Sequence, residues 1–147
     1  MGKFTLSVFI NRSQQDVFDF LSDPANIPKW DSDFESAVWT SNGVPGIGST
    51  YRASGKRLGS EKDGFFEIVQ WDRPNRYSYK AKERMFLFEH AETTIMLKPK
   101  DHGTEAFCEY QFEIIGRLKF AEGFVARMGK KRIEGNLNAA KRSLEAG

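Results

Sequence analysis

The strongest constraint on the fold is a change of hydrophobic period near the C-terminal end of the chain. Between Glu35 and Ile115, apolar residues mostly alternate with polar ones, and turn sequences such as "SNGVPGIG" and "KPKDHG" interrupt the alternation. Beyond this region, apolar residues recur at spacings of three and four. Alternation is the period of a half-buried strand, and the second pattern is that of an amphipathic helix. The short connections predict an antiparallel meander followed by a long helix over about the last 28 residues.

Three segments of the predicted meander indicate which side chains point inward. In "TEAFCEYQFEI" the inward set is Ala106, Cys108, Tyr110, Phe112 and Ile114. In "EHAETTIMLK" it is Ala91, Thr93, Ile95 and Leu97. The segment "FFEIVQW" is ambiguous, because either of two sets could point inward: Phe65, Glu67, Val69 and Trp71, or Phe66, Ile68 and Gln70.

The N-terminal part predicts one strand and two short helices. "KFTLSVFIN" alternates and reads as the first strand. Ser13 then precedes a helical apolar face in a capping-box-like pattern, and this helix should end at Asp23. Asp23 can cap a second, one-turn helix with Pro24 at its first position, where a missing N–H costs nothing. Trp30 would anchor the buried side of that turn.

The predicted C-terminal helix carries one apolar stripe and one basic cluster. The stripe comprises Ala121, Val125, Met128, Gly129, Ile133, Leu137, Ala140 and Leu144. The cluster comprises Arg127, Lys130, Lys131 and Arg132, and it could attract anionic lipid. Because Glu122 and Glu134 interrupt the cluster, a solvated helix face is the favoured interpretation.

Composition predicts a single domain over residues 1–147 and excludes several functional classes. A net charge of +2 and the lack of a basic groove with interleaved aromatics argue against nucleic-acid binding. Two histidines and one cysteine, without metal-ligand spacing, predict no metal site, and no cofactor is expected. No apolar run is long enough to span a bilayer, so no stable membrane insertion is expected. With a lone cysteine and no signal peptide, we expect a cytoplasmic protein.

The order of elements resembles the helix-grip architecture of the START/SRPBCC superfamily, in its polyketide cyclase/dehydrase branch, which is related in fold to the birch pollen allergen. The resemblance covers nearly the whole chain and rests on "VFDFLSDPANIPKWDSDF", "VPGIGSTYR", "EIVQWDRPNRYSYKA", "HGTEAFCEYQFEI" and "EGNLNAAKRSLE". It implies an α+β fold in which a curved antiparallel sheet of about seven strands wraps around a long C-terminal helix, with two short helices after the first strand. The superfamily includes ligand carriers, cyclases, dehydratases and regulators, so the resemblance is nearly silent on function.

The resemblance also implies a cavity beneath the C-terminal helix, lined by inward strand faces. The candidate cavity residues are Trp30, Tyr51, Glu67, Val69, Trp71, Tyr77, Tyr79, Thr93, Ile95, Cys108, Tyr110, Phe112, Phe124 and Met128. This aromatic, mostly apolar set suits a hydrophobic ligand. The alternative is an ordinary packed core, with Trp30 as a core anchor.

Two residues of this set are candidates for a catalytic role. Glu67, if it points inward, would have a raised pKa and could act as a general acid or base, but the competing register places it in solvent. Cys108 would need a nearby base to act as a nucleophile, so a buried structural thiol is expected. We therefore expect a carrier or sensor of a small lipid-like, isoprenoid or aromatic ligand. The alternative is a cyclase, aromatase or dehydratase acting in the same cavity; no protein partner is indicated.

Overall fold

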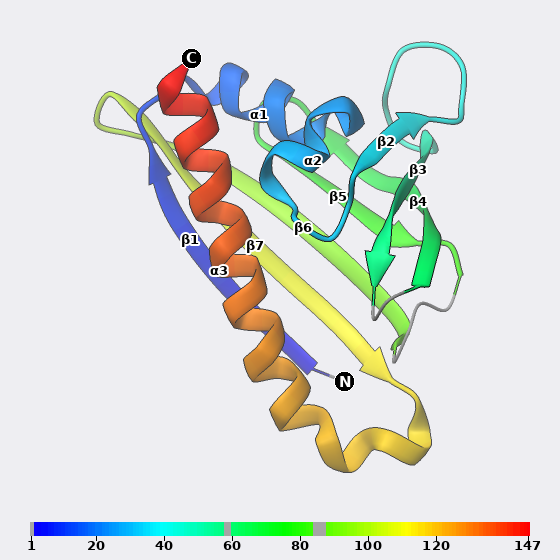
Figure 1. Ribbon diagram of the computed structural model, residues 1–147. Helices are drawn as coiled ribbons and strands as arrows, with labels where there is room; N and C mark the ends of the chain where they lie inside the picture. Colours follow the sequence, from blue (N-terminus) through cyan, green and yellow to red (C-terminus); the bar gives the residue numbers. More distant parts are fainter. Residues whose placement is uncertain (1, 58–59, 84–87) are drawn as a thin grey trace.

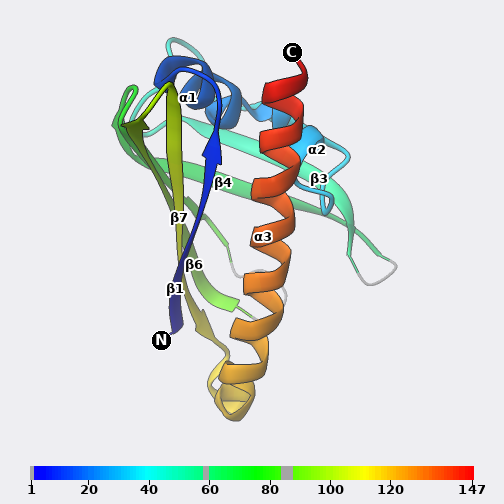
Figure 2. The ribbon, with the colours of Figure 1, turned by 90° about the vertical axis from the view of Figure 1, so that its left-hand side faces the viewer.

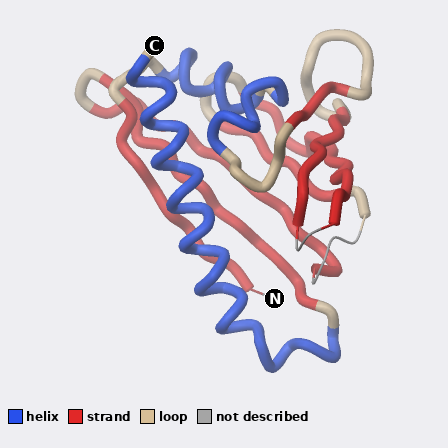
Figure 3. Tube along the Cα trace, viewed as in Figure 1, coloured by secondary structure: helices blue, strands red, loops and turns tan. Residues whose placement is uncertain are grey.

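The computed structural model describes residues 2–57, 60–83 and 88–147, and within these ranges seven strands form one antiparallel sheet (Figure 3). The strands are β1 (Gly2–Ile10), β2 (Ser36–Trp39), β3 (Thr50–Arg57), β4 (Ser60–Asp72), β5 (Arg76–Ala81), β6 (Phe88–Lys100) and β7 (Gly103–Ile114). Their order is β1-β7-β6-β5-β4-β3-β2, so successive strands from β2 to β7 are neighbours and β1 pairs with β7. The predicted meander is confirmed.

Three short helical segments follow β1: α1 (Gln14–Ser22), the 3-10 helix η1 (Pro24–Asn26) and α2 (Ile27–Trp30). The hydroxyl of Ser13 accepts a hydrogen bond from the backbone N–H of Asp16 at 3.1 Å, which caps α1. The carboxylate of Asp23 accepts one from the N–H of Ala25 at 3.0 Å, which caps η1. The predicted second helix is therefore a 3-10 turn that continues into one turn of α-helix.

The long helix α3 (Glu122–Ala146), preceded by the 3-10 helix η2 (Gly116–Ala121), runs across the inside of the curved sheet (Figures 1 and 2). It packs mainly on β1 and α2. Its buried apolar side chains are those of Ile133, Leu137, Ala140 and Leu144, all members of the predicted stripe. This is the helix-grip arrangement, an α+β fold with the sheet wrapped around the C-terminal helix.

Hydrogen bonds fix the C-terminal end of α3 to the junction of β1 and α1. A guanidinium nitrogen of Arg12 donates to the carbonyl of Leu144 at 2.7 Å, and so satisfies a carbonyl in the last turn of the helix. Lys141 donates to the carbonyl of Phe9 at 2.7 Å. The backbone N–H of Asn11 donates to the carboxylate of Glu145 at 2.9 Å. This end of the helix is thereby held in place over the sheet.

The beginning of α3 departs from the prediction. Phe124 and Met128, expected in the cavity, are exposed by 64% and 58%. The first turns of α3 extend past the N-terminal end of β1, so no strand lies beneath them (Figures 1 and 2). None of the helices in the described ranges combines the length and apolar character that crossing a bilayer requires.

A β-bulge in β4 resolves the ambiguous register. Phe66 and Ile68 point inward, Val69 is skipped in the pairing with β5, and the pairing resumes at Gln70. The extra residue returns Trp71 to the inner face, where it contacts Phe18. The register with Phe66 and Ile68 inward therefore holds before the bulge, and the register with Trp71 inward holds after it.

Candidate ligand-binding cavity

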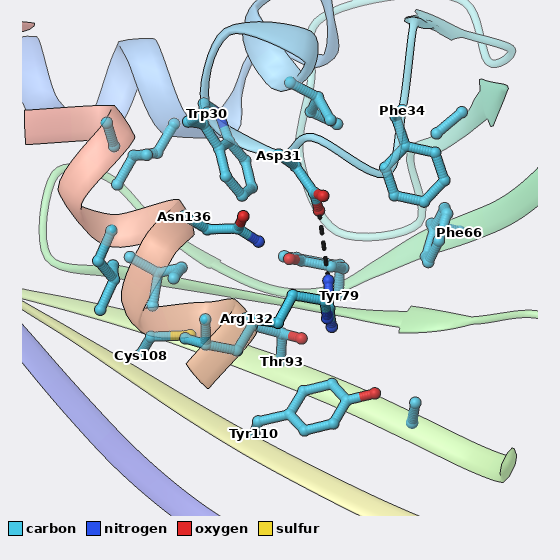
Figure 4. Close-up of a pocket in the computed structure, with 18 of the residues that line it drawn as sticks. Trp30, Asp31, Phe34, Phe66, Tyr79, Thr93, Cys108, Tyr110, Arg132 and Asn136 are labelled. Carbon is cyan, nitrogen blue, oxygen red and sulfur yellow. Dashed lines mark ion pairs between the residues drawn. The ribbon is translucent and has the colours of Figure 1, made fainter. Parts of the chain in front are cut away.

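A cavity of about 90 Å³ lies between the underside of α3, the segment from α2 to β2, and the inner face of the sheet. One water molecule needs about 10–15 Å³ on this scale, so the space is large enough for a small organic group. Most of the lining is apolar: Leu21, Ile27, Trp30, Phe34, Tyr51, Ala53, Phe66, Tyr79, Ala81, Phe88, Ala91, Ile95, Cys108, Tyr110, Ile133, Leu137 and Ala140. The polar members are Asp31, Thr93, Arg132 and Asn136. Figure 4 shows how the labelled side chains converge from α2, the sheet and α3.

Four aromatic rings form one wall of the cavity. Tyr51 of β3 stacks on Phe66 of β4 with ring centroids 5.1 Å apart. Tyr79 of β5 meets both rings edge-on, at 6.1 Å and 6.0 Å, and Phe34 meets Phe66 at 6.2 Å. Neighbouring inward positions on β3, β4 and β5 bring three of these rings together, and the segment before β2 supplies Phe34. The wall offers flat π faces and edges against which an apolar ligand can pack.

Arg132 forms the charged edge of the cavity. Its guanidinium lies 3.2 Å from a carboxylate oxygen of Asp33 and 3.7 Å from one of Asp31. The exposed fractions of these three side chains are 32%, 26% and 10% respectively, so the cluster is largely removed from water. Burial lowers the pKa of Arg132, but the electrostatic effects of Asp31, Tyr110, Asp33 and Tyr79 together outweigh it and leave the pKa raised. The cluster joins α3 to the segment that follows α2.

Two buried N–H donors in the lining have no acceptor within the described part of the chain. They are the amide nitrogen of Asn136 and the indole nitrogen of Trp30. Asn136 is only 6% exposed and sits on the buried stripe of α3. Buried polar groups normally have a hydrogen-bond partner, so these donors are exceptions that call for an explanation.

Burial keeps three titratable side chains on the sheet side of the cavity, those of Tyr51, Tyr79 and Cys108, in their neutral forms. Desolvation by burial raises the pKa of Tyr51 and of Tyr79 above the ordinary value. Burial likewise raises the pKa of the Cys108 thiol to about 12. Cys108 is therefore a thiol and not a thiolate, which deprives it of nucleophilic character. No group of three or more His, Cys, Asp or Glu side chains is placed to hold a metal ion in the described ranges.

Seven of the predicted residues line this cavity: Trp30, Tyr51, Tyr79, Thr93, Ile95, Cys108 and Tyr110. They come from α2 and from strands β3, β5, β6 and β7, and the alternation of the strands turns them to a common side. Tyr79 and Thr93 are directly opposite each other on β5 and β6, so their hydroxyl-bearing side chains are neighbours in the lining. Half of the residues that the sequence analysis names therefore lie along this cavity.

The other seven predicted residues lie elsewhere, each for a structural reason. Phe124 and Met128 are on the exposed first turns of α3. Glu67 is on the outer face of β4, opposite Thr50 and Lys80, and Val69 is the bulged residue. Trp71 and Tyr77 point inward but pack against Phe18 of α1, with centroid distances of 5.0 Å and 5.3 Å. Phe112 is buried between Phe4 and Phe88.

Sequence reasoning missed the polar edge of the cavity. Arg132 was assigned to the solvated basic cluster, whereas it points to Asp31 and Asp33. Asn136 was overlooked, although it follows Ile133 by three positions and precedes Ala140 by four, which places a polar residue inside the apolar stripe. That interruption of the stripe was the available signal. For the two aspartates, the signal was their position one and three residues after Trp30.

The sequence matches, over residues 1–145, the family described as polyketide cyclase / dehydrase and lipid transport. The chain belongs to this family. Among curated proteins, none matches the sequence. Family membership agrees with the START/SRPBCC helix-grip fold and with ligand binding or cyclase activity as broad roles, since the family description names both lipid transport and cyclases.

Solved structures share the fold of this family member at low sequence identity. The protein TTHA0849 from Thermus thermophilus is 16% identical, with a TM-score of 0.80 over 99% of this chain and 98% of that one. A START superfamily protein from Mycobacterium smegmatis is 12% identical, with a TM-score of 0.80 over 98% and 97% of the two chains. The di-domain ARO/CYC protein StfQ of the steffimycin biosynthetic pathway is 17% identical, with a TM-score of 0.81 over 98% of this chain and 50% of that one. At such identities the similarity is one of fold alone.

Proposed function

We propose that this protein binds one small hydrophobic molecule in the cavity beneath α3, as a carrier or sensor. The observation that carries the proposal is the aromatic and aliphatic lining of the space between helix and sheet. Apolar surface that a ligand buries here contributes about 25 cal/mol per Å² to binding, before the cost of the ligand's lost freedom is subtracted. We include the expected cytoplasmic location in this proposal.

The state of the cavity's ionisable groups supports binding over acid–base or nucleophilic chemistry. Tyr51, Tyr79 and Cys108 are all held in their neutral forms by burial. Glu67, the carboxylate considered as a general acid or base, is on the opposite face of the sheet. A carrier needs a mostly apolar cavity and no reactive group, and these features support that role.

A cyclase, aromatase or dehydratase is the second candidate, and the polar edge is the observation that favours it. Arg132 and Asn136 border the same cavity as Tyr79 and Thr93. Such groups could orient and polarise a carbonyl-containing substrate. Chemical change of a bound molecule would separate this candidate from a carrier, which releases its ligand unaltered.

Native mass spectrometry of freshly purified protein tests the proposal. We expect either one apolar adduct per chain, which solvent extraction then identifies, or an apo protein that takes up one added molecule of an apolar aromatic compound. The variant Glu67→Gln should behave identically, because Glu67 lies outside the cavity. A protein with no adduct and no saturable uptake of such compounds would contradict the proposal.

A further inference from the structure

The buried amide of Asn136 shows what chemistry a ligand must bring. Its nitrogen has no hydrogen-bond acceptor within the described residues, and Figure 4 shows the side chain pointing from α3 into the cavity between Trp30 and Arg132. An unsatisfied buried donor costs free energy, which a ligand recovers if it places an acceptor there. The indole nitrogen of Trp30 is a second such donor, and it can only donate. Because both groups are donors, they favour a ligand that carries an oxygen atom able to accept a hydrogen bond.

The charges at the cavity edge decide what kind of oxygen this is. Arg132 is the cation of the lining, and it already interacts with the carboxylates of Asp31 and Asp33. A ligand carboxylate would bring a third negative charge to one guanidinium and would lose its own hydration in an apolar space. A neutral carbonyl avoids both costs. The cluster thus disfavours anions although an arginine is present.

We infer that the ligand is a neutral, mainly apolar molecule with a carbonyl oxygen that accepts a hydrogen bond from the Asn136 amide. Ketones, aldehydes, esters and amides belong to this class, whereas free carboxylic acids and pure hydrocarbons do not. The inference rests on the proposed function, since it specifies the occupant of the same cavity.

Equilibrium dialysis with three naphthalenes of similar shape tests the charge preference. The compounds are 2-acetonaphthone, which has a neutral carbonyl; 2-naphthoate, which is an anion at pH 7.5; and 2-ethylnaphthalene, which has no acceptor. We expect the wild-type protein to bind the ketone at least about tenfold more tightly than the carboxylate, because the carboxylate bears the cost of burying a charge. Equal or tighter binding of the carboxylate would overturn the inference and make Arg132 an anion site.

The variants Asn136→Leu and Asn136→Ala test the hydrogen bond itself. Leucine keeps the branched shape of asparagine without its donor but is bulkier, and alanine guards against a misfit of the leucine. For each variant, the ratio of ketone affinity to ethylnaphthalene affinity should fall roughly fivefold, as for loss of one neutral hydrogen bond. Because ethylnaphthalene needs no donor, its binding should persist.

The outcomes separate the two proposals. If ethylnaphthalene binds but the affinity ratio is the same in wild type and variants, the inference about Asn136 fails and the hydrophobic carrier stands. If none of the three compounds binds saturably to the wild-type protein, the proposed function fails for this ligand class, and the inference fails with it.

Discussion

Arg132 of α3 donates a hydrogen bond to the carboxylate of Asp33, with 3.2 Å between Nη1 and Oδ2. The contact spans 99 positions of sequence and joins the C-terminal helix to the segment between α2 and β2. Asp31 lies 3.7 Å from the same nitrogen and shares the positive charge. One side chain therefore connects α3 to the segment that follows α2 and limits what can bind between them.

Removing Arg132 should destabilise the fold. In Arg132→Met the aliphatic stem is retained, but the largely buried Asp31 and Asp33 lose their cation. We expect the free energy of unfolding to fall by about 1–3 kcal/mol, below the cost of breaking a fully buried pair because the cluster is partly exposed. Urea denaturation monitored by tryptophan fluorescence measures the change.

Arg73→Met is the matched control for this experiment. Arg73 pairs with Asp19 at 2.7 Å, and both of these side chains are about half exposed. Screening by solvent makes such a pair weak, so the control should be much less destabilised. Equal losses in the two variants would show that the Arg132 cluster has no special role in joining the walls.

Cys108 should react slowly with thiol reagents in the folded protein. Burial raises the pKa of its thiol to about 12, so thiolate is scarce at pH 8, and access to the cavity wall is restricted. We expect iodoacetamide to modify the native protein at least about a hundredfold more slowly than the urea-unfolded chain. Mass spectrometry of timed samples gives both rates. Rapid modification at pH 7 would instead indicate an activated thiolate and favour a catalytic cysteine.

Two glycine-to-alanine substitutions should have opposite effects on stability. At Gly55 of β3, an added Cβ would lie 2.0 Å from the backbone carbonyl oxygen of Asp33, so Gly55→Ala should cost about 1–3 kcal/mol. At Gly135 of α3 nothing lies within 4 Å of an added Cβ, so Gly135→Ala should stabilise the helix by about 0.5–1 kcal/mol. Thermal unfolding of both variants checks the signs. A neutral Gly55→Ala would mean that β3 and the Asp33 segment do not approach so closely.

Glu67→Gln should leave ligand affinity within about twofold of wild type. The carboxylate is on the outer face of β4, across the sheet from the cavity, and a solvated surface charge contributes little at that separation. Dialysis with 2-acetonaphthone measures the affinity. A loss of tenfold or more would return Glu67 to the set of cavity residues and imply a different register in β4.

The strands could be predicted from sequence because their outer faces are polar. In β7, every second residue from Ala106 to Ile114 is buried, as the alternation indicated. In β4 the pattern failed because a bulge at Val69 shifts the inward set by one residue. A single inserted residue leaves both alternating sets partly apolar, so periodicity alone cannot locate it.

The cavity could be predicted only in part. The hydrophobic periodicity of a strand indicates which of its faces points inward, but it does not indicate which helix or strand packs against that face. Tyr77 and Tyr79 share one face of β5, yet Tyr77 packs under α1 while Tyr79 lines the cavity. Likewise, the apolar stripe of α3 continued through Met128, but the sheet beneath it ends sooner. Arg132 and Asn136 belong to the site through tertiary contacts that no local pattern contains.

The most direct test of the account is a fluorescence titration with the neutral apolar probe N-phenyl-1-naphthylamine, in wild type and in Ala91→Phe. Ala91 lines the cavity from β6, and phenylalanine there would fill it; Ser7→Phe, on an exposed position of β1, is the control. We expect saturable binding of one probe per chain in wild type and Ser7→Phe, and at least about tenfold weaker binding in a folded Ala91→Phe. Equal probe affinity in all three proteins would contradict it, because the probe would then bind outside the cavity.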